Sequence, residues 1–151
     1  MGDLQLTSSA FADDTEIPRK FGYKNGNSSP PLTISGIPTE AKSLVLIMDD
    51  PDAVGAVGKV WVHWVVWNID LITEIAESTT PDSGIEGMTD FGKVGYGGPA
   101  PPDKRHTYVF KLYALDVMLD LPSESAKADV EKAMEGHIAD QATLTGTYAP
   151  D

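Results

Sequence analysis

The sequence predicts a single domain, residues 1–151, of mainly β structure. A length of 151 residues is ordinary for one domain, and no internal repeat or composition shift marks a linker. The 14 Gly and 11 Pro gather between apolar runs, which is typical of strands joined by turns. Three of these runs are rich in β-branched and aromatic residues, which favour strands.

The three runs predict strands at residues 44–48, 60–69 and 107–115. The first is continuously apolar, as expected for a strand that is covered on both faces. Shorter strands are predicted at residues 4–7, 32–35 and 146–148. The 37 residues between Ile69 and Thr107 have little periodicity and many Gly and Pro, so we expect an ordered, functional loop there.

One helix is predicted near the C-terminus. Ser123 is an N-cap candidate, and a helix-forming stretch follows to about Ala139, although Gly136 weakens it. Four residues share one face at helical spacing: Val130, Met134, His137 and Ile138. We therefore expect a structural role for His137.

The chain is strongly acidic, with 11 Lys and Arg against 23 Asp and Glu, a formal net charge of -12. Such a chain repels phosphate backbones and anionic membranes, so we expect neither nucleic-acid binding nor stable membrane association. A small anionic ligand is compatible with this net charge, because the electrostatic potential of a local site can be opposite in sign to that of the whole protein. The absence of Cys excludes disulfides, thiol nucleophiles and Cys-ligated metal centres.

The N-terminal residues have no basic start followed by an apolar stretch, so no signal peptide is predicted. No apolar run approaches the roughly 18–20 residues of a membrane-spanning helix. These observations predict a cytoplasmic protein.

Polar side chains lie near the ends of two predicted strands. Strand alternation places Trp61, His63, Val65 and Trp67 on one face of the second strand. It places His106, Tyr108 and Phe110 on one face of the third. In both strands a polar group thus precedes apolar residues on the same face, which is typical of a small-ligand pocket.

Asp50 and a Gly-rich loop complete this candidate site. Imidazole and phenol groups can donate to phosphate or carboxylate oxygens, and the N–H groups of such loops can bind an anion. We expect Asp50 to accept a hydrogen bond from a His rather than to face the anion. The predicted ligand-binding residues are Asp50, His63, Gly97, Gly98, Pro99, His106 and Tyr108.

Other interpretations stay open. His63 has the surroundings of a satisfied core histidine, and Gly97-Gly98 those of a simple tight turn. Asp50, His63 and His106 are also the ligand types of a two-His, one-carboxylate metal centre, but a phenol and a Gly-rich loop suit an anion better. No hydrolase, P-loop or metalloprotease motif occurs. We therefore predict no catalytic residue, no metal and no cofactor.

Five segments, in this order, resemble motifs of one known family. They are NGNSSPPL at residues 25–32, DDPDA at 49–53, WVHWVVWNI at 61–69, GYGGPAPP at 95–102 and HTYVF at 106–110. Together they resemble the phosphatidylethanolamine-binding protein family, in its prokaryotic Raf-kinase-inhibitor-like branch. The sequence departs from the family pattern at Val54, Lys104-Arg105 and Thr107.

The resemblance implies a β-sandwich of two antiparallel sheets, with a C-terminal helix and short peripheral helices. It also implies a small pocket for phosphate-like or acetate-like groups, and Asp50, His63, His106 and Tyr108 fall at its pocket positions.

We therefore expect a non-catalytic binding protein, monomeric or homodimeric, for phosphate-, phosphoethanolamine- or carboxylate-type groups. Two alternatives remain. The first is an inhibitory protein that acts on a protease or kinase through the pocket-side loops, and the second is a metal-dependent or acid–base hydrolase.

Overall fold

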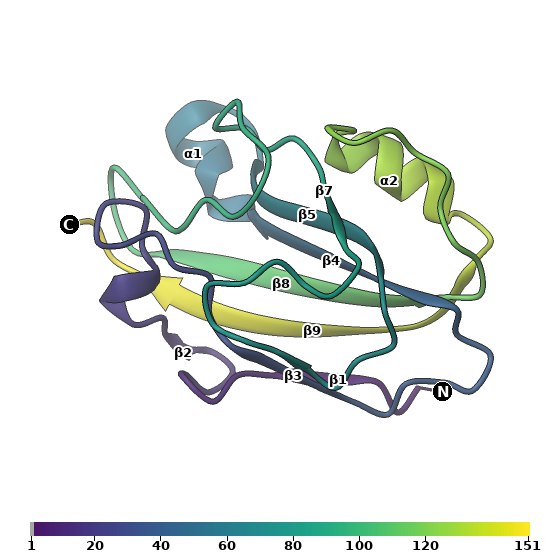
Figure 1. Ribbon diagram of the computed structural model, residues 1–151. Helices are drawn as coiled ribbons and strands as arrows, with labels where there is room; N and C mark the ends of the chain where they lie inside the picture. The colour runs from purple at the N-terminus through teal and green to yellow at the C-terminus, as the bar shows by residue number, and fades with distance from the viewer. Residues whose placement is uncertain (1) are drawn as a thin grey trace.

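Two β-sheets packed face to face make up most of the molecule (Figure 1). The computed structural model describes residues 2–151. The smaller sheet has the strand order β1-β3-β6 and the larger β2-β9-β8-β4-β5-β7. The strands are β1 (Gln5–Thr7), β2 (Thr15–Glu16), β3 (Leu32–Ser35), β4 (Ser43–Asp50), β5 (Trp61–Ile69), β6 (Glu74–Ile75), β7 (Ile85–Glu86), β8 (His106–Leu115) and β9 (Ile138–Tyr148). The predicted mainly β class is confirmed, and all strand pairs are antiparallel except β2–β9, which is parallel.

The core follows from the alternation of side chains along β4, which is buried over its whole length. Leu44, Leu46 and Met48 face the smaller sheet and join its apolar side chains in the main core cluster. Val45 and Ile47 face the opposite side and belong to a second cluster, beneath a helix. A strand buried on both faces has a continuous apolar sequence, as predicted for this segment.

Helix α2 (Lys127–Met134) covers the outer face of the larger sheet (Figure 1). Its Val130 and Met134 are buried against Val45 and Ile47. Asp49, whose side chain is only 1% exposed, accepts hydrogen bonds from Lys127 at 2.7 Å and from Lys111 of β8 at 3.0 Å. The carboxylate thus links the helix to the sheet beneath it.

The helix is shorter than predicted at both ends. Glu124 has φ +72°, a left-handed conformation that a helix cannot continue through, so residues 122–125 form a turn before α2. At the other end Gly136, with φ +81°, reverses the chain. His137 therefore lies beyond the helix, half-exposed beside Asp116 at 3.0 Å, and its predicted place on the apolar helix face is wrong.

The other predicted strands agree with the structure to within a few residues, except at the C-terminal end. There the prediction of residues 146–148 covers only the last part of β9. A strand therefore follows the only helix of more than one turn in residues 2–151. No helix among these residues is long and apolar enough to cross a membrane.

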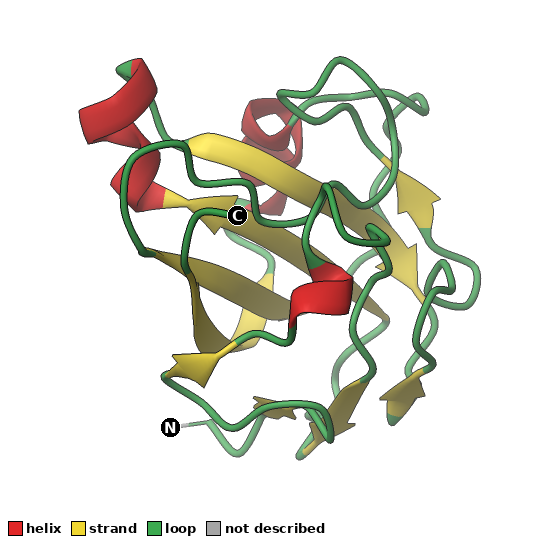
Figure 2. Cartoon of the chain, turned by 90° about the vertical axis from the view of Figure 1, so that its left-hand side faces the viewer, coloured by secondary structure: helices red, strands yellow, loops and turns green. Residues whose placement is uncertain are grey.

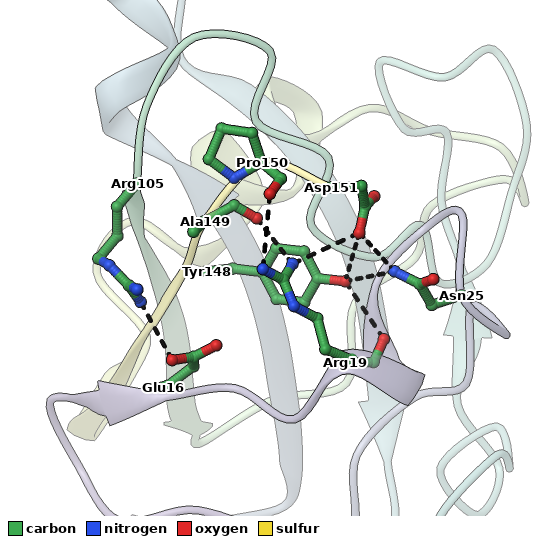
Figure 3. Close-up of polar contacts among 8 residues, drawn as sticks. All are labelled: Glu16, Arg19, Asn25, Arg105, Tyr148, Ala149, Pro150 and Asp151. Carbon is green, nitrogen blue, oxygen red and sulfur yellow. Dashed lines mark hydrogen bonds and ion pairs between the residues drawn. The ribbon is translucent and has the colours of Figure 1, made fainter.

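A cluster around Tyr148 fastens the end of β9 to residues 19–27, a 3₁₀ helix, η1 (Arg19–Phe21), followed by a loop (Figure 3). The Arg19 guanidinium lies 4.3 Å from the centre of the Tyr148 ring and donates to the Ala149 carbonyl at 2.7 Å. Asn25 donates through Nδ2 to the Tyr148 hydroxyl at 2.9 Å and to Asp151 at 2.6 Å. The same loop supports the Gly-rich segment described below.

We expect Asp49→Asn to lower the free energy of unfolding by roughly 3 kcal/mol, because it leaves two partly buried ammonium groups without their carboxylate. Chemical denaturation monitored by tryptophan fluorescence measures this. Glu77→Gln removes an exposed ion pair with Lys20 at 2.9 Å and serves as the control, with a loss below about 0.5 kcal/mol. Equal losses in the two variants would contradict a structural role for Asp49.

Candidate functional site

A cavity of about 160 Å³ lies where β4 ends and where β5 and β8 begin. Figure 2 views the molecule from this end, where the short helix α1 (Val54–Val57) and long loops gather around the strand ends. The polar residues of its lining are Asp50, His63, His106 and Tyr108. The apolar residues are Ala53, Ala56, Val57, Trp61, Phe91, Ala100 and Pro102. The structure thus brings together the four polar side chains that the sequence predicted for the site.

A β-bulge in β5 directs His63 toward this cavity. Met48 of β4 pairs with Trp64, and the next residue, Asp49, pairs with Val62, so His63 is an extra residue without a partner on β4. A bulge of this kind changes the phase of side-chain alternation. Val62 therefore packs with the outer cluster beneath α2, while the His63 ring lies 5.1 Å from Tyr108.

The predicted common face of Trp61, His63, Val65 and Trp67 is consequently wrong. Trp61 and His63 line the cavity, whereas Val65 and Trp67 lie in the cluster beneath α2. Strict alternation fails because the bulge falls between the two pairs.

His63 and Gly97 are joined by two hydrogen bonds. The Gly97 N–H donates to the His63 carbonyl at 2.8 Å, and the His63 Nδ1 lies 2.6 Å from the Gly97 carbonyl. A carbonyl only accepts, so Nδ1 carries the proton and Nε2 of the neutral ring is an acceptor. Burial lowers the pKa of His63 to about 4, although the Gly97 and Gly98 backbone opposes the shift. His63 is therefore neutral at pH 7.

The Gly-rich loop supports His63 from outside the cavity. The Gly97 N–H is used by His63, and the Gly98 N–H donates to Asn27 Oδ1 at 2.7 Å. A Cβ on Gly98 would lie 2.0 Å from the Phe21 carbonyl oxygen, so only glycine fits. Neither glycine nor Pro99 lines the cavity, and Pro99 instead accepts a hydrogen bond from the Tyr23 N–H. The expectation that these N–H groups bind an anion is not met, because both are already paired.

His106 lies between two carboxylates. Its Nδ1 is 2.6 Å from Asp50 Oδ2 and its Nε2 is 2.8 Å from Asp103 Oδ1. Carboxylates only accept, so both ring nitrogens donate and the imidazole is positively charged. Burial disfavours this charge, but the bonds to Asp50 and Asp103 outweigh it and raise the pKa of His106. The predicted His partner for Asp50 is thus confirmed as His106.

Asp50 is held in place from two sides. Besides His106, its Oδ1 accepts from the Asp52 N–H at 2.9 Å, at the start of a 3₁₀ turn, η2 (Pro51–Ala53). Burial raises the pKa of Asp50, while the bonds from His106 and Asp52 lower it. These two hydrogen bonds favour the ionised carboxylate next to the imidazolium.

The Tyr108 hydroxyl is buried and forms no hydrogen bond of good geometry, although the Asp50 carboxylate and the Ala100 backbone lie near it. Burial, together with the neighbouring Asp50 carboxylate, raises the pKa of Tyr108 far above its ordinary value. The phenol therefore keeps its proton at physiological pH. A buried O–H group without an acceptor costs free energy, about 1–3 kcal/mol. An acceptor atom that enters the cavity would remove this cost.

The cavity therefore has one unpaired donor, the Tyr108 hydroxyl, and two acceptor groups, His63 Nε2 and the Asp50 carboxylate, while both N–H groups of His106 are already bonded to Asp50 and Asp103. His106 has no free lone pair, which does not suit a metal ligand. No group of three or more His, Cys, Asp or Glu side chains within residues 2–151 is arranged to hold a metal ion.

Sequence reasoning missed Phe91 and Asp103. The Phe91 ring stacks on Tyr23 at 4.5 Å and contacts His63 edge-on at 5.3 Å, so it forms one wall of the cavity. The available signal for Phe91 was an aromatic residue followed by glycine in a Gly-rich loop. Asp103 lies three residues before His106 in an irregular segment, and no local pattern indicates that it turns back to that ring.

We expect NMR titration of the imidazoles to give a midpoint above 6.5 for His106 and one near 4 for His63. Two carboxylates favour the charged form of His106, whereas burial favours the neutral form of His63. ¹⁵N shifts should show a doubly protonated His106 and a neutral His63 with its proton on Nδ1 at pH 7. A midpoint for His63 at or above 6.5 would contradict this assignment.

Comparison with known proteins places the chain in a family. The model of the phosphatidylethanolamine-binding protein family matches residues 7–149. A UPF0098 protein of Methanothermobacter thermautotrophicus is 46% identical over 151 residues, which cover 96% of this chain and 98% of the relative.

Two crystal structures have the same fold. A phosphatidylethanolamine-binding protein homologue from Chlamydia trachomatis superposes with a TM-score of 0.92 at 40% identity, covering 100% of both chains. Escherichia coli YbcL, described as a member of the mammalian PEBP family, gives a TM-score of 0.90 at 31% identity, covering 99% of this chain and 100% of YbcL. The chain therefore belongs to the phosphatidylethanolamine-binding protein family.

Proposed function

We propose that this chain is a non-catalytic binding protein whose cavity holds the anionic group of a small molecule, a carboxylate or a phosphate ester. The observation that carries the proposal is the Tyr108 hydroxyl, a buried donor without an acceptor, in a cavity that also contains the His106 imidazolium. An anionic oxygen would give this hydroxyl its missing partner, and a charge-assisted hydrogen bond is stronger than a neutral one.

The acceptor on His63 adds a second requirement. Its Nε2 can accept a hydrogen bond but, in the neutral ring, cannot donate one. A ligand that carries an O–H or N–H group beside its anionic oxygen, such as a singly protonated phosphate ester, would pair with both His63 and Tyr108.

The walls of the cavity indicate that the ligand has apolar atoms next to its anionic group. Val57, Trp61 and Phe91 line it, and Val57 is about half exposed at its rim. Apolar atoms next to the anionic group would be removed from water against these side chains. The volume of about 160 Å³ accommodates a headgroup-sized molecule.

We expect Tyr108→Phe to weaken acetate and inorganic phosphate binding by about tenfold or more, because it removes a hydrogen bond to a charged group. The same change should leave the stability of the ligand-free protein unchanged or higher, since it also removes an unpaired buried hydroxyl. NMR titration gives the affinity, and chemical denaturation gives the stability.

Tyr113→Phe is the matched control. Tyr113 lies in the same strand, β8, but outside the cavity, so this variant should bind both anions as the wild type does. Saturable binding that is equal in wild type and Tyr108→Phe would place the anion elsewhere. If no saturable binding occurs in the wild type or in any cavity variant, the proposed function is wrong.

A further inference from the structure

Asp103 holds the outer nitrogen of His106. The His106 side chain is 1% exposed and its Nε2 donates to Asp103 Oδ1 at 2.8 Å, while the Asp103 side chain is 41% exposed. The inner nitrogen is bound to Asp50, which is itself buried. The two carboxylates on this ring therefore differ, because Asp50 is buried within the site whereas Asp103 contacts the ring from the surface.

The Asp103 carboxylate has the chemistry expected of a ligand. It is a monoanion, and one of its oxygens accepts a charge-assisted hydrogen bond from an imidazolium that lines the cavity. With this contact in place, His106 has no N–H left for an anion in the cavity. On the basis of the proposed function, we infer that Asp103 is an internal competitor, which an anionic ligand displaces from His106 Nε2, and that it determines which ligand charge the site accepts.

The short segment that carries Asp103 runs along the surface from Pro102 to Arg105. Pro102 lines the cavity on one side. On the other side Arg105 pairs with Glu16 at 3.4 Å (Figure 3). It also donates to Thr147 Oγ1 at 3.2 Å. Only Asp103 and Lys104 lie between Pro102 and Arg105. Displacement therefore requires a rearrangement of this short segment rather than of the sheet, and the released carboxylate regains its hydration.

Charge makes the competition selective. Asp50, Asp103 and the His106 imidazolium together carry one negative charge. After displacement Asp103 stays tethered close to the ligand and repels it in proportion to the ligand's charge. The wild type should therefore favour a monoanion over a dianion, and removal of the Asp103 charge should weaken this preference.

The test compares acetate with inorganic phosphate at pH 8, where phosphate is mostly a dianion, and the His106 titration is measured in each protein, because loss of Asp103 removes one of the two bonds that raise the pKa of His106. Dissociation constants are measured by NMR for the wild type, Asp103→Asn and Asp103→Ala. Asp103→Asn removes the charge but keeps an acceptor, whereas Asp103→Ala removes both. We expect Asp103→Ala to bind acetate about tenfold more tightly than the wild type does, and its gain in affinity for phosphate to be larger than its gain for acetate. The affinities of Asp103→Asn should lie between those of the wild type and those of Asp103→Ala.

Asp116→Ala is the matched control, because Asp116 also pairs with a His, His137, at 3.0 Å, but on the surface and away from the cavity. Its anion affinities should equal those of the wild type. In the ligand-free proteins, the His106 Nε2 resonance should shift in both Asp103 variants and stay unchanged in Asp116→Ala. An unshifted resonance would show that the contact is not formed in solution, and would overturn the inference.

The remaining outcomes separate this inference from the proposed function. If the wild type binds anions in a Tyr108-dependent manner, and both Asp103 variants bind them with unchanged affinity, Asp103 is no competitor and the proposed function stands. If neither the wild type nor the Asp103 variants bind either anion, the competitor is refuted together with the anion site.

Discussion

One extra residue in β5 determines how the site is built. Because His63 has no partner on β4, its side chain points into the cavity instead of continuing the alternation of Val65 and Trp67. Its ring and its backbone carbonyl then both bond to Gly97, which positions the Gly-rich loop over the strand ends. Without the bulge, alternation would turn His63 to the α2 side of the sheet, and the cavity would lose its only uncharged ring acceptor. Bulges are common next to functional sites for this reason.

The consecutive residues Asp49 and Asp50 show how the pleat of a strand places two neighbouring carboxylates in different surroundings. Both are almost fully buried, and they point to opposite faces of the sheet. Asp49 meets two lysines and holds α2, while Asp50 meets His106 and keeps it charged. A chain with a net charge of -12 can in this way keep a positively charged ring in the wall of a cavity.

Much of the fold was predictable because it depends on local pattern. The continuous apolar sequence before Asp49 and the aromatic-rich segment from Trp61 became β4 and β5. The predicted helix was too long because left-handed backbone at Glu124 and Gly136 ends it, and only the glycine signals this in the sequence. The bulge at His63 and the contact of Asp103 with His106 were not predictable, because they depend on the partner strand and on the path of an irregular loop. Prediction therefore identified the four polar groups of the cavity and a His partner for Asp50, but not that the second nitrogen of His106 and Nδ1 of His63 are also paired.

The cluster around Tyr148 has a consequence for the order of folding. Ile17 and Phe21 are completely buried, yet Ile17 packs on Gly146 and Asn25 bonds to Tyr148, partners more than 100 residues later. The N-terminal segment therefore cannot complete its packing until β9 has been synthesised. Contacts between residues so distant in sequence slow folding and prolong the exposure of apolar side chains. During translation this segment is where we expect the nascent chain to be most exposed to chaperones and to aggregation.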